Sequence, residues 1–179
     1  MEPRGVILLG YRGSGKTTVG PKLADRLGLR FADTDDEVVR RFGGRPIKKI
    51  WEDVGEPAFR EVEADVLEEQ VAKPGVVVAL GGGAVTQSAA SRVAVRNSDA
   101  LKVYLFAPAM VLAHRIRGDA GTANNRPSLT ADGSADAEVA EVLSLRDPVY
   151  RKTADVVVDV SKASIEEIVE EIAAAYEAT

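Results

Sequence analysis

The sequence has no cysteine and only one histidine among its 179 residues. Disulfide bonds and thiolate metal sites are therefore excluded, and His114 has no second histidine with which to form a zinc site. Aromatic residues make up 5% of the chain, and the formal net charge is -5. An acidic chain offers no bulk electrostatic attraction for nucleic acid or an anionic membrane, so we expect neither as a partner.

Long apolar runs are also missing. The chain enters a strand-like segment directly, without a basic leader and a long apolar stretch, so we expect no secretory signal and no membrane span. Because no cysteine requires an oxidising compartment, we expect a cytoplasmic protein. A chain of this length with 45% apolar residues can close one core. We predict a single domain over residues 1–179, with a monomer as the default state.

Short apolar runs alternate with helical patterns along the chain. Strands are predicted at 6–9, 29–32, 76–80, 101–106 and 156–160, and helices at 17–27, 57–71, 109–116, 137–145 and 164–176. This alternation predicts an α/β fold in which helices cover both faces of a parallel sheet. Ligands then bind at the carboxyl ends of the strands.

One segment, residues 118–135, breaks this alternation. It is polar, rich in glycine and asparagine, and longer than an ordinary connection, so we predict a mobile lid. Within it, Arg126 could swing over bound phosphates and supply positive charge to a transition state. A lid that excludes water favours transfer to a bound acceptor over hydrolysis.

The strongest motif follows the first predicted strand and opens a helix. Residues 10–17 read Gly-Tyr-Arg-Gly-Ser-Gly-Lys-Thr, which matches the phosphate-binding P-loop at every position. Backbone N–H groups of such a loop cradle phosphates, Lys16 reaches the β- and γ-phosphates, and Thr17 ligates magnesium. The predicted ATP contacts in this region are Gly13, Ser14, Gly15, Lys16, Thr17 and Thr18. The motif alone does not distinguish a kinase from a GTPase or a motor.

Two carboxylates follow the second predicted strand in Asp33-Thr34-Asp35. Their side chains point in different directions, so Asp33 could face magnesium while Asp35 accepts a proton from an acceptor hydroxyl or orients it. A helix N-cap followed by acidic residues in the first turn explains the same residues equally well.

Arginines and glycines lie at other expected ligand positions. Arg60 is near the start of a helix, and Arg146 lies near the end of another; such residues are more often solvated, although a guanidinium suits a carboxylate or phosphate. Three glycines, 81–83, follow the third predicted strand. They indicate either a close ligand contact, which we favour, or a turn that needs positive φ.

Together these segments closely resemble the shikimate kinase family over nearly the whole chain. The matching segments are the P-loop, Asp33-Thr34-Asp35, Gly44-Arg45, Gly55-Glu56, Phe59-Arg60, Gly81-Gly82-Gly83-Ala84-Val85, Arg126-Pro127 and Arg146-Asp147-Pro148-Val149-Tyr150-Arg151. The resemblance implies a three-layer α/β/α P-loop fold with a five-stranded parallel sheet. It also implies transfer of the γ-phosphoryl group of ATP to the 3-hydroxyl of shikimate, with Mg2+, in aromatic amino-acid biosynthesis.

The resemblance also implies roles for individual residues. The implied shikimate contacts are Asp35, Arg60, Gly82, Gly83 and Arg146, with the two arginines on the carboxylate and Asp35 on the hydroxyls. Asp33 and Thr17 correspond to the magnesium site, Lys16 and Arg126 to the charges that stabilise transfer, and Arg115 to an adenine contact. An acceptor-binding helical segment is expected over about 35–62, where Phe42, Trp51 and Phe59 are more typical of packing than of base stacking.

The sequence departs from the family pattern at Ser128, where leucine is more common after the Arg-Pro pair, and its lid is longer. Two rival interpretations remain. A P-loop kinase of another small hydroxy acid would share the fold and the lid. A GTPase-like switch is disfavoured because the chain has no Asn-Lys-x-Asp guanine-reading motif.

Overall fold

Five parallel strands form a single sheet in the order β2-β3-β1-β4-β5. The structure is a computed structural model that describes residues 4–118 and 135–179. The strands are β1 (Val6–Leu9), β2 (Arg30–Asp33), β3 (Val76–Ala79), β4 (Leu101–Phe106) and β5 (Val156–Asp159). Each predicted strand is present, with bounds that differ from the prediction by at most one residue.

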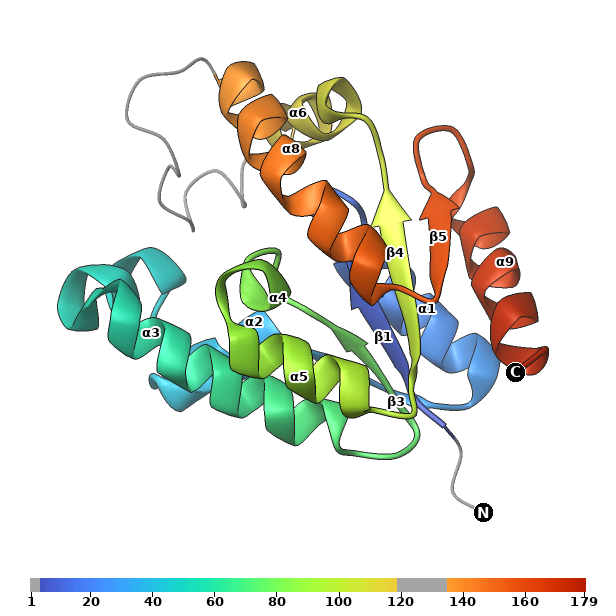
Figure 1. Ribbon diagram of the computed structural model, residues 1–179, viewed down its shortest axis with the longest axis horizontal. Helices are drawn as coiled ribbons and strands as arrows, with labels where there is room; N and C mark the ends of the chain where they lie inside the picture. The colour runs from blue at the N-terminus through green and yellow to red at the C-terminus, as the bar shows by residue number, and fades with distance from the viewer. Residues whose placement is uncertain (1–3, 119–134) are drawn as a thin grey trace.

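Helices cover both faces of this sheet (Figure 1). The helices of the described residues are α1 (Lys16–Leu27), α2 (Thr34–Arg41), α3 (Ile47–Val71), α4 (Ala84–Gln87), α5 (Ala89–Asn97), α6 (Ala109–Gly118), α8 (Ala135–Thr153) and α9 (Ile165–Glu177). Helices α1 and α9 pack together on one face, and α3, α5 and α8 lie on the other. The predicted three-layer α/β/α architecture is therefore confirmed.

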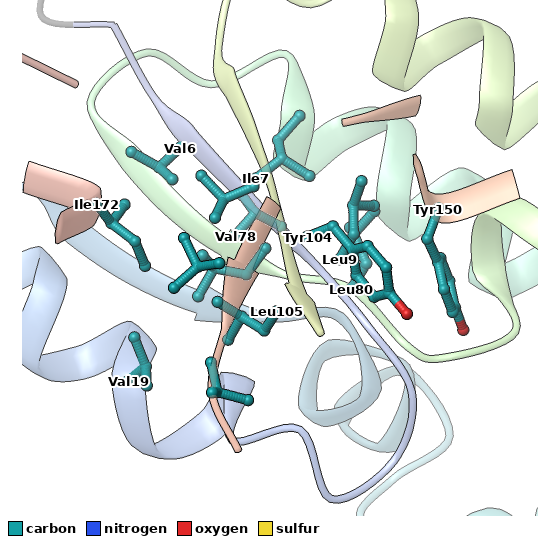
Figure 2. Close-up of a cluster of buried hydrophobic side chains, with 14 of the residues drawn as sticks. Val6, Ile7, Leu9, Val19, Val78, Leu80, Tyr104, Leu105, Tyr150 and Ile172 are labelled. Atoms are coloured by element: carbon teal, nitrogen blue, oxygen red, sulfur yellow. The ribbon is translucent and has the colours of Figure 1, made fainter. Parts of the chain in front are cut away.

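The main core is built on the central strand. All four residues of β1 are buried, because helices on both faces leave neither side of the strand in water. Figure 2 shows Val19 of α1 and Ile172 of α9 on one side of the strands, with Tyr104 and Tyr150 on the other. A buried β1 fixes the position of the P-loop, which begins one residue after the strand ends.

A second, smaller apolar cluster holds α2 against α3. Its buried members are Val38, Ile47, Ile50, Phe59 and Val66. Phe42 and Trp51 pack against it, as predicted for these aromatic residues, and the ring centroids of Trp51 and Phe59 lie 5.6 Å apart. All the buried members except Val66 lie within the predicted acceptor-binding segment of about 35–62, so this segment contributes most of a separate core.

Several helices differ from the sequence prediction. The helix predicted from residue 57 is the second part of α3. A first part, over 47–54, precedes it, and Gly55, with φ 80° and ψ 162°, separates the two parts. The helix predicted to end at residue 145 continues as α8 to Thr153, with Pro148 inside it. A proline usually ends or kinks a helix, which is why the longer helix was not predicted. Helix α5 was not predicted. Among the described residues, no helix is both long enough and apolar enough to cross a bilayer.

Candidate active site

A cleft of about 880 Å3 runs along the carboxyl ends of the strands. Its walls include residues 12–18, which cover most of the P-loop, and the acidic residues Asp33, Asp35 and Asp36. The cleft therefore lies where ligands bind in open α/β sheets, next to the N-terminus of α1.

The P-loop has the backbone that its glycines predict. Gly13 and Gly15 have φ values of 81° and 95°, a left-handed region that side chains rarely adopt, and Gly15 is the N-cap of α1. The ammonium of Lys16 donates hydrogen bonds to the carbonyl oxygens of Gly10 (2.7 Å) and Tyr11 (3.1 Å). Thr17 and Thr18 are exposed in the first turn of the helix. The loop thus keeps its lysine within the cleft through its own carbonyls.

The two carboxylates after β2 share this cleft but have different surroundings. The Oδ1 atom of Asp33 accepts a hydrogen bond from the backbone N–H of Asp35 at 2.8 Å, which makes Asp33 the N-cap of α2. Asp33 is buried and Asp35 is half-buried. The N-cap interpretation of Asp33 is confirmed, and both carboxylates lie on the wall of the cleft.

None of the three glycines after β3 has positive φ, and at Gly81 and Gly83 a side chain would collide with neighbouring side chains. A Cβ atom on Gly81 would lie 2.7 Å from Oδ1 of Asp35, and one on Gly83 would lie 3.1 Å from a guanidinium nitrogen of Arg60. The turn is also held in place, since the N–H of Gly81 donates to Oγ1 of Thr34 at 3.0 Å. The alternative of a turn that needs positive φ is wrong here. The glycines instead let two candidate ligand-binding side chains approach the backbone.

A smaller pocket continues from the cleft toward α3. Its lining consists of Tyr11, Arg12, Asp35, Ile47, Trp51, Phe59, Arg60, Glu63, Gly82, Gly83 and Arg146. The five residues that the resemblance implies as shikimate contacts are all in this set. The pocket combines apolar walls with three guanidinium groups, a combination suited to a small organic anion.

Arg60 is held rigidly on the wall of this pocket. It donates to the buried carboxylate of Glu63 at 2.6 Å and approaches Glu56 at 3.4 Å. Its guanidinium carbon also lies 5.2 Å from the ring centroid of Trp51 and 5.4 Å from that of Phe59. An arginine fixed by a carboxylate and two rings offers its remaining N–H groups in a defined direction.

Arg146 enters the pocket from α8. Its guanidinium lies over the ring of Tyr11, 5.7 Å from the centroid. One turn later, the buried hydroxyl of Tyr150 donates a hydrogen bond to the carbonyl oxygen of Gly82. Helix α8 therefore supplies a cation and also anchors the glycine turn opposite it.

The end of α8 is tied to β4 by a polar cluster. The hydroxyl of Tyr104 donates to Asp147 at 2.8 Å, and Nε of Arg151 donates to the other oxygen of the same carboxylate at 2.7 Å. Burial and the hydrogen bond to Asp147 raise the pKa of Tyr104 well above its ordinary value. These contacts fix the part of α8 that carries Arg146.

Arg115 also lines the cleft. It donates to the carbonyl oxygen of Val160 at 2.6 Å and approaches that of Gly13 at 3.4 Å. The neighbouring cleft walls are apolar, formed by Ile116, Val160, Ala163, Ile165 and Ile168. A planar guanidinium beside apolar side chains suits the face of a purine base.

Some residues fall outside either the structure or the sequence prediction. Arg126 and most of the predicted lid, residues 119–134, lie outside the described residues. Sequence reasoning missed Glu63, Tyr150 and Arg12 as parts of the site. The (i, i+3) spacing from Arg60 could have indicated Glu63, whereas only tertiary structure brings Tyr150 to Gly82 and Arg12 to the junction between the two pockets.

Comparison with known proteins identifies the family. A sequence model described as shikimate kinase matches residues 12–177. The chain belongs to the shikimate kinase family. A shikimate kinase of Oleidesulfovibrio alaskensis is 47% identical over 154 residues, which are 86% of this chain and 87% of its own. One from Rhodopirellula baltica is 41% identical over 172 residues, which are 96% and 90% of the two chains.

Structural comparison gives the same family. The shikimate kinase from Acinetobacter baumannii, solved in complex with shikimate, superposes with a TM-score of 0.88 and 32% sequence identity. The match covers 98% of this chain and 94% of that one. The fold and family predicted from the sequence are confirmed, and ATP is the co-substrate of shikimate kinases.

Proposed function

We propose that this protein transfers the γ-phosphoryl group of ATP to the 3-hydroxyl of shikimate, forming shikimate 3-phosphate and ADP. The observation that carries the proposal is the meeting of two pockets at Asp35. One pocket contains the P-loop, and the other contains Arg60 and Arg146. A phosphoryl donor in one pocket and a small anionic acceptor in the other would thus both reach the same carboxylate.

ATP binds with its phosphates in the P-loop. Backbone N–H groups of Gly13 and Gly15, with the N-terminus of α1, donate hydrogen bonds to phosphate oxygens, and Ser14 lies between them in the loop. Lys16 exchanges its bonds to the loop carbonyls for the β- and γ-phosphates, and Arg115 lies against the adenine. The apolar walls beside Arg115 support this orientation of the nucleotide.

Magnesium suits the oxygen ligands at the centre of this cleft. Thr17 has an exposed hydroxyl, and Asp33 contributes carboxylate to the same wall. No cluster of three or more metal-ligating side chains exists in the described ranges, 4–118 and 135–179. That fits Mg2+, which takes few protein ligands and otherwise binds phosphate and water. When bound, it neutralises charge on the β- and γ-phosphates.

Shikimate occupies the smaller pocket. Arg60 and Arg146 bind its carboxylate, and the backbone of Gly82 and Gly83 approaches the ring closely because no side chain intervenes. Asp35 then contacts the hydroxyls. This acceptor side corresponds to the segment over about 35–62, within a single domain that we propose to act as a monomer in the cytoplasm.

During transfer, the 3-hydroxyl oxygen forms a bond to the γ-phosphorus while the bond from that phosphorus to the ADP oxygen breaks. Asp35 accepts the hydroxyl proton, or orients the hydroxyl until the proton is lost. Lys16 stabilises the charge on the transferring group. We propose the same role for Arg126, together with closure of the 118–135 lid, on the strength of its position in the family motif.

The function is tested by measuring ADP release from purified protein with Mg2+ and ATP. Shikimate is compared with gluconate, nucleoside monophosphates and a blank without acceptor. We expect release to depend on shikimate. If another acceptor gave ADP while shikimate matched the blank, the substrate would be wrong and the kinase assignment would stand. If no acceptor gave more ADP than the blank, both the substrate and the kinase assignment would be contradicted.

A further inference from the structure

Four residues line both pockets and therefore stand at the junction between donor and acceptor. They are Arg12, Asp35, Ile47 and Gly82. This set contains one carboxylate and one cation. Because a phosphoryl group must pass between the two pockets, charged groups at their junction act on the reacting atoms and not on the distant ends of either substrate.

The guanidinium of Arg12 has no partner among the residues that the structure describes. Its Nε atom is buried and makes no hydrogen bond there. By contrast, Arg60 of the smaller pocket pairs with Glu63, and Arg115 of the cleft donates to the carbonyl oxygen of Val160. Arg12 as a whole is only half-buried and lines both pockets, so its guanidinium is available to an anionic ligand that lies between them.

We propose that Arg12 is a further catalytic residue, which binds the phosphoryl group during transfer and retains it on the product. The proposal rests on the proposed function. The P-loop motif accepts any residue at this position, so the charge is a property of this chain and not of the motif. Arg60 and Arg146 line only the acceptor pocket, which assigns them to the carboxylate and leaves Arg12 for the phosphoryl oxygens.

Arg12 and Asp35 act on different atoms in the same phosphoryl-transfer step. As the bond from phosphorus to ADP breaks and the bond to the acceptor oxygen forms, Asp35 accepts the hydroxyl proton. Negative charge spreads over the three remaining phosphoryl oxygens, and the guanidinium of Arg12 donates N–H groups to them. The same contacts persist on the phosphate of the product, so Arg12 favours product over substrate.

The test compares R12Q and the conservative R12K with a matched control, R96Q. Arg96 is exposed on α5, away from both pockets. For each protein, melting temperature verifies the fold, steady-state kinetics give kcat and KM for shikimate, and calorimetry gives the affinities for shikimate and shikimate 3-phosphate. Calorimetry supplies a readout that does not depend on turnover.

We expect R12Q to lower kcat about 100-fold, the usual effect of removing one donor to transition-state charge, with KM for shikimate nearly unchanged. Its affinity for shikimate 3-phosphate should fall about tenfold while that for shikimate is retained, and R12K should be intermediate. R12Q kinetics like those of R96Q would overturn the proposal, as would equal losses of affinity for both ligands. Wild-type protein that made no ADP with shikimate would instead overturn the proposed function.

Discussion

Glycine at position 81 shows how the site depends on space at the scale of single residues. The carboxylate of Asp35 packs where a Cβ atom would otherwise lie, and Glu63 approaches the same point at 3.1 Å. A methyl group there would displace functional side chains before it disturbed the sheet. Position 81 therefore ties a backbone feature directly to the orientation of the proposed base.

We predict that Gly81→Ala lowers kcat about 100-fold, because a displacement of the Asp35 carboxylate by about 1 Å is enough for a loss of that size. The melting temperature should fall by only a few degrees, since a side chain can move to accommodate the methyl group. Shikimate-dependent ADP release and a thermal melt measure the two effects. Full activity in this variant would show that the position of Asp35 relative to Gly81 is unimportant.

At the scale of elements, the break in α3 determines where Arg60 points. Gly55 has φ 80° and ψ 162°, a conformation open essentially to glycine alone, and Pro57 starts the second helical part with a preset φ. Arg60 then lies one turn inside, beside Glu63. The Gly-Glu-Pro sequence marked this helix start, but nothing local indicated the preceding helix over 47–54.

Helix α8 is the second element that positions a cation, and its anchor is sensitive to pH. Tyr104 donates to Asp147, and burial together with that bond raises the pKa of Tyr104 in the folded protein. In the unfolded chain, tyrosine ionises near its ordinary pKa of about 10. The stabilisation by Tyr104 is therefore complete below about pH 10 and is lost as pH rises toward the folded-state value.

We predict that Tyr104→Phe lowers the free energy of unfolding by about 2 kcal/mol at neutral pH, the scale of a hydrogen bond to a charged group. Above about pH 10 the difference from wild type should shrink, because wild-type stability falls more steeply. Urea titrations at pH 7 and pH 10.5 measure this. Stability curves that stayed parallel across that range would contradict the assigned pKa shift.

The sequence predicted the strands well and the contacts around the site poorly, for physical reasons. Buried parallel strands such as β1 are continuous apolar runs, and the P-loop is a local sequence motif, so both can be recognised from the amino-acid sequence alone. The pairing of Arg60 with Glu63 has helical spacing but no unique signature. The approach of Tyr150 to Gly82 joins residues 68 apart in sequence, which only the folded chain brings together.

The role of the three glycines at 81–83 was likewise predicted only in part from the sequence. Their position after a strand indicated a ligand contact, which we favoured over a turn with positive φ. Only the structure shows which side chains occupy this space: Asp35 at Gly81, and Gln87 together with Arg60 at Gly83. Helix α5 was missed because it is only nine residues long, which is too short for its apolar positions to form a clear helical period.

For the whole molecule, the carboxyl ends of the strands carry two pockets that share Asp35, to which we assign the nucleotide and the acceptor. The two sides have separate apolar cores, one under the P-loop and one between α2 and α3. A ligand that binds only the folded protein stabilises it. A ligand in either pocket should therefore raise the free energy of unfolding by about 2.7 kcal/mol at a concentration 100 times its dissociation constant. Magnesium should matter on the nucleotide side only.

We predict that ADP raises the melting temperature further with Mg2+ than with EDTA, and that Thr17→Val removes this difference. The substitution keeps the shape of the side chain and deletes only the proposed ligand hydroxyl. Thr18→Val, which changes the neighbouring exposed hydroxyl, should retain the magnesium effect. Equal magnesium effects in both variants would exclude Thr17 as a ligand.

The central claim is that the γ-phosphoryl group of ATP is transferred to shikimate at Asp35, and 31P NMR of the reaction mixture tests it most directly. With wild-type protein, Mg2+, ATP and shikimate, we expect one new phosphomonoester signal that couples to the proton on C3, with ADP formed in equal amount. Asp35→Asn should give the same signal at a rate lower by orders of magnitude. Formation of inorganic phosphate with unchanged shikimate, or an Asp35→Asn variant as fast as wild type, would contradict the account.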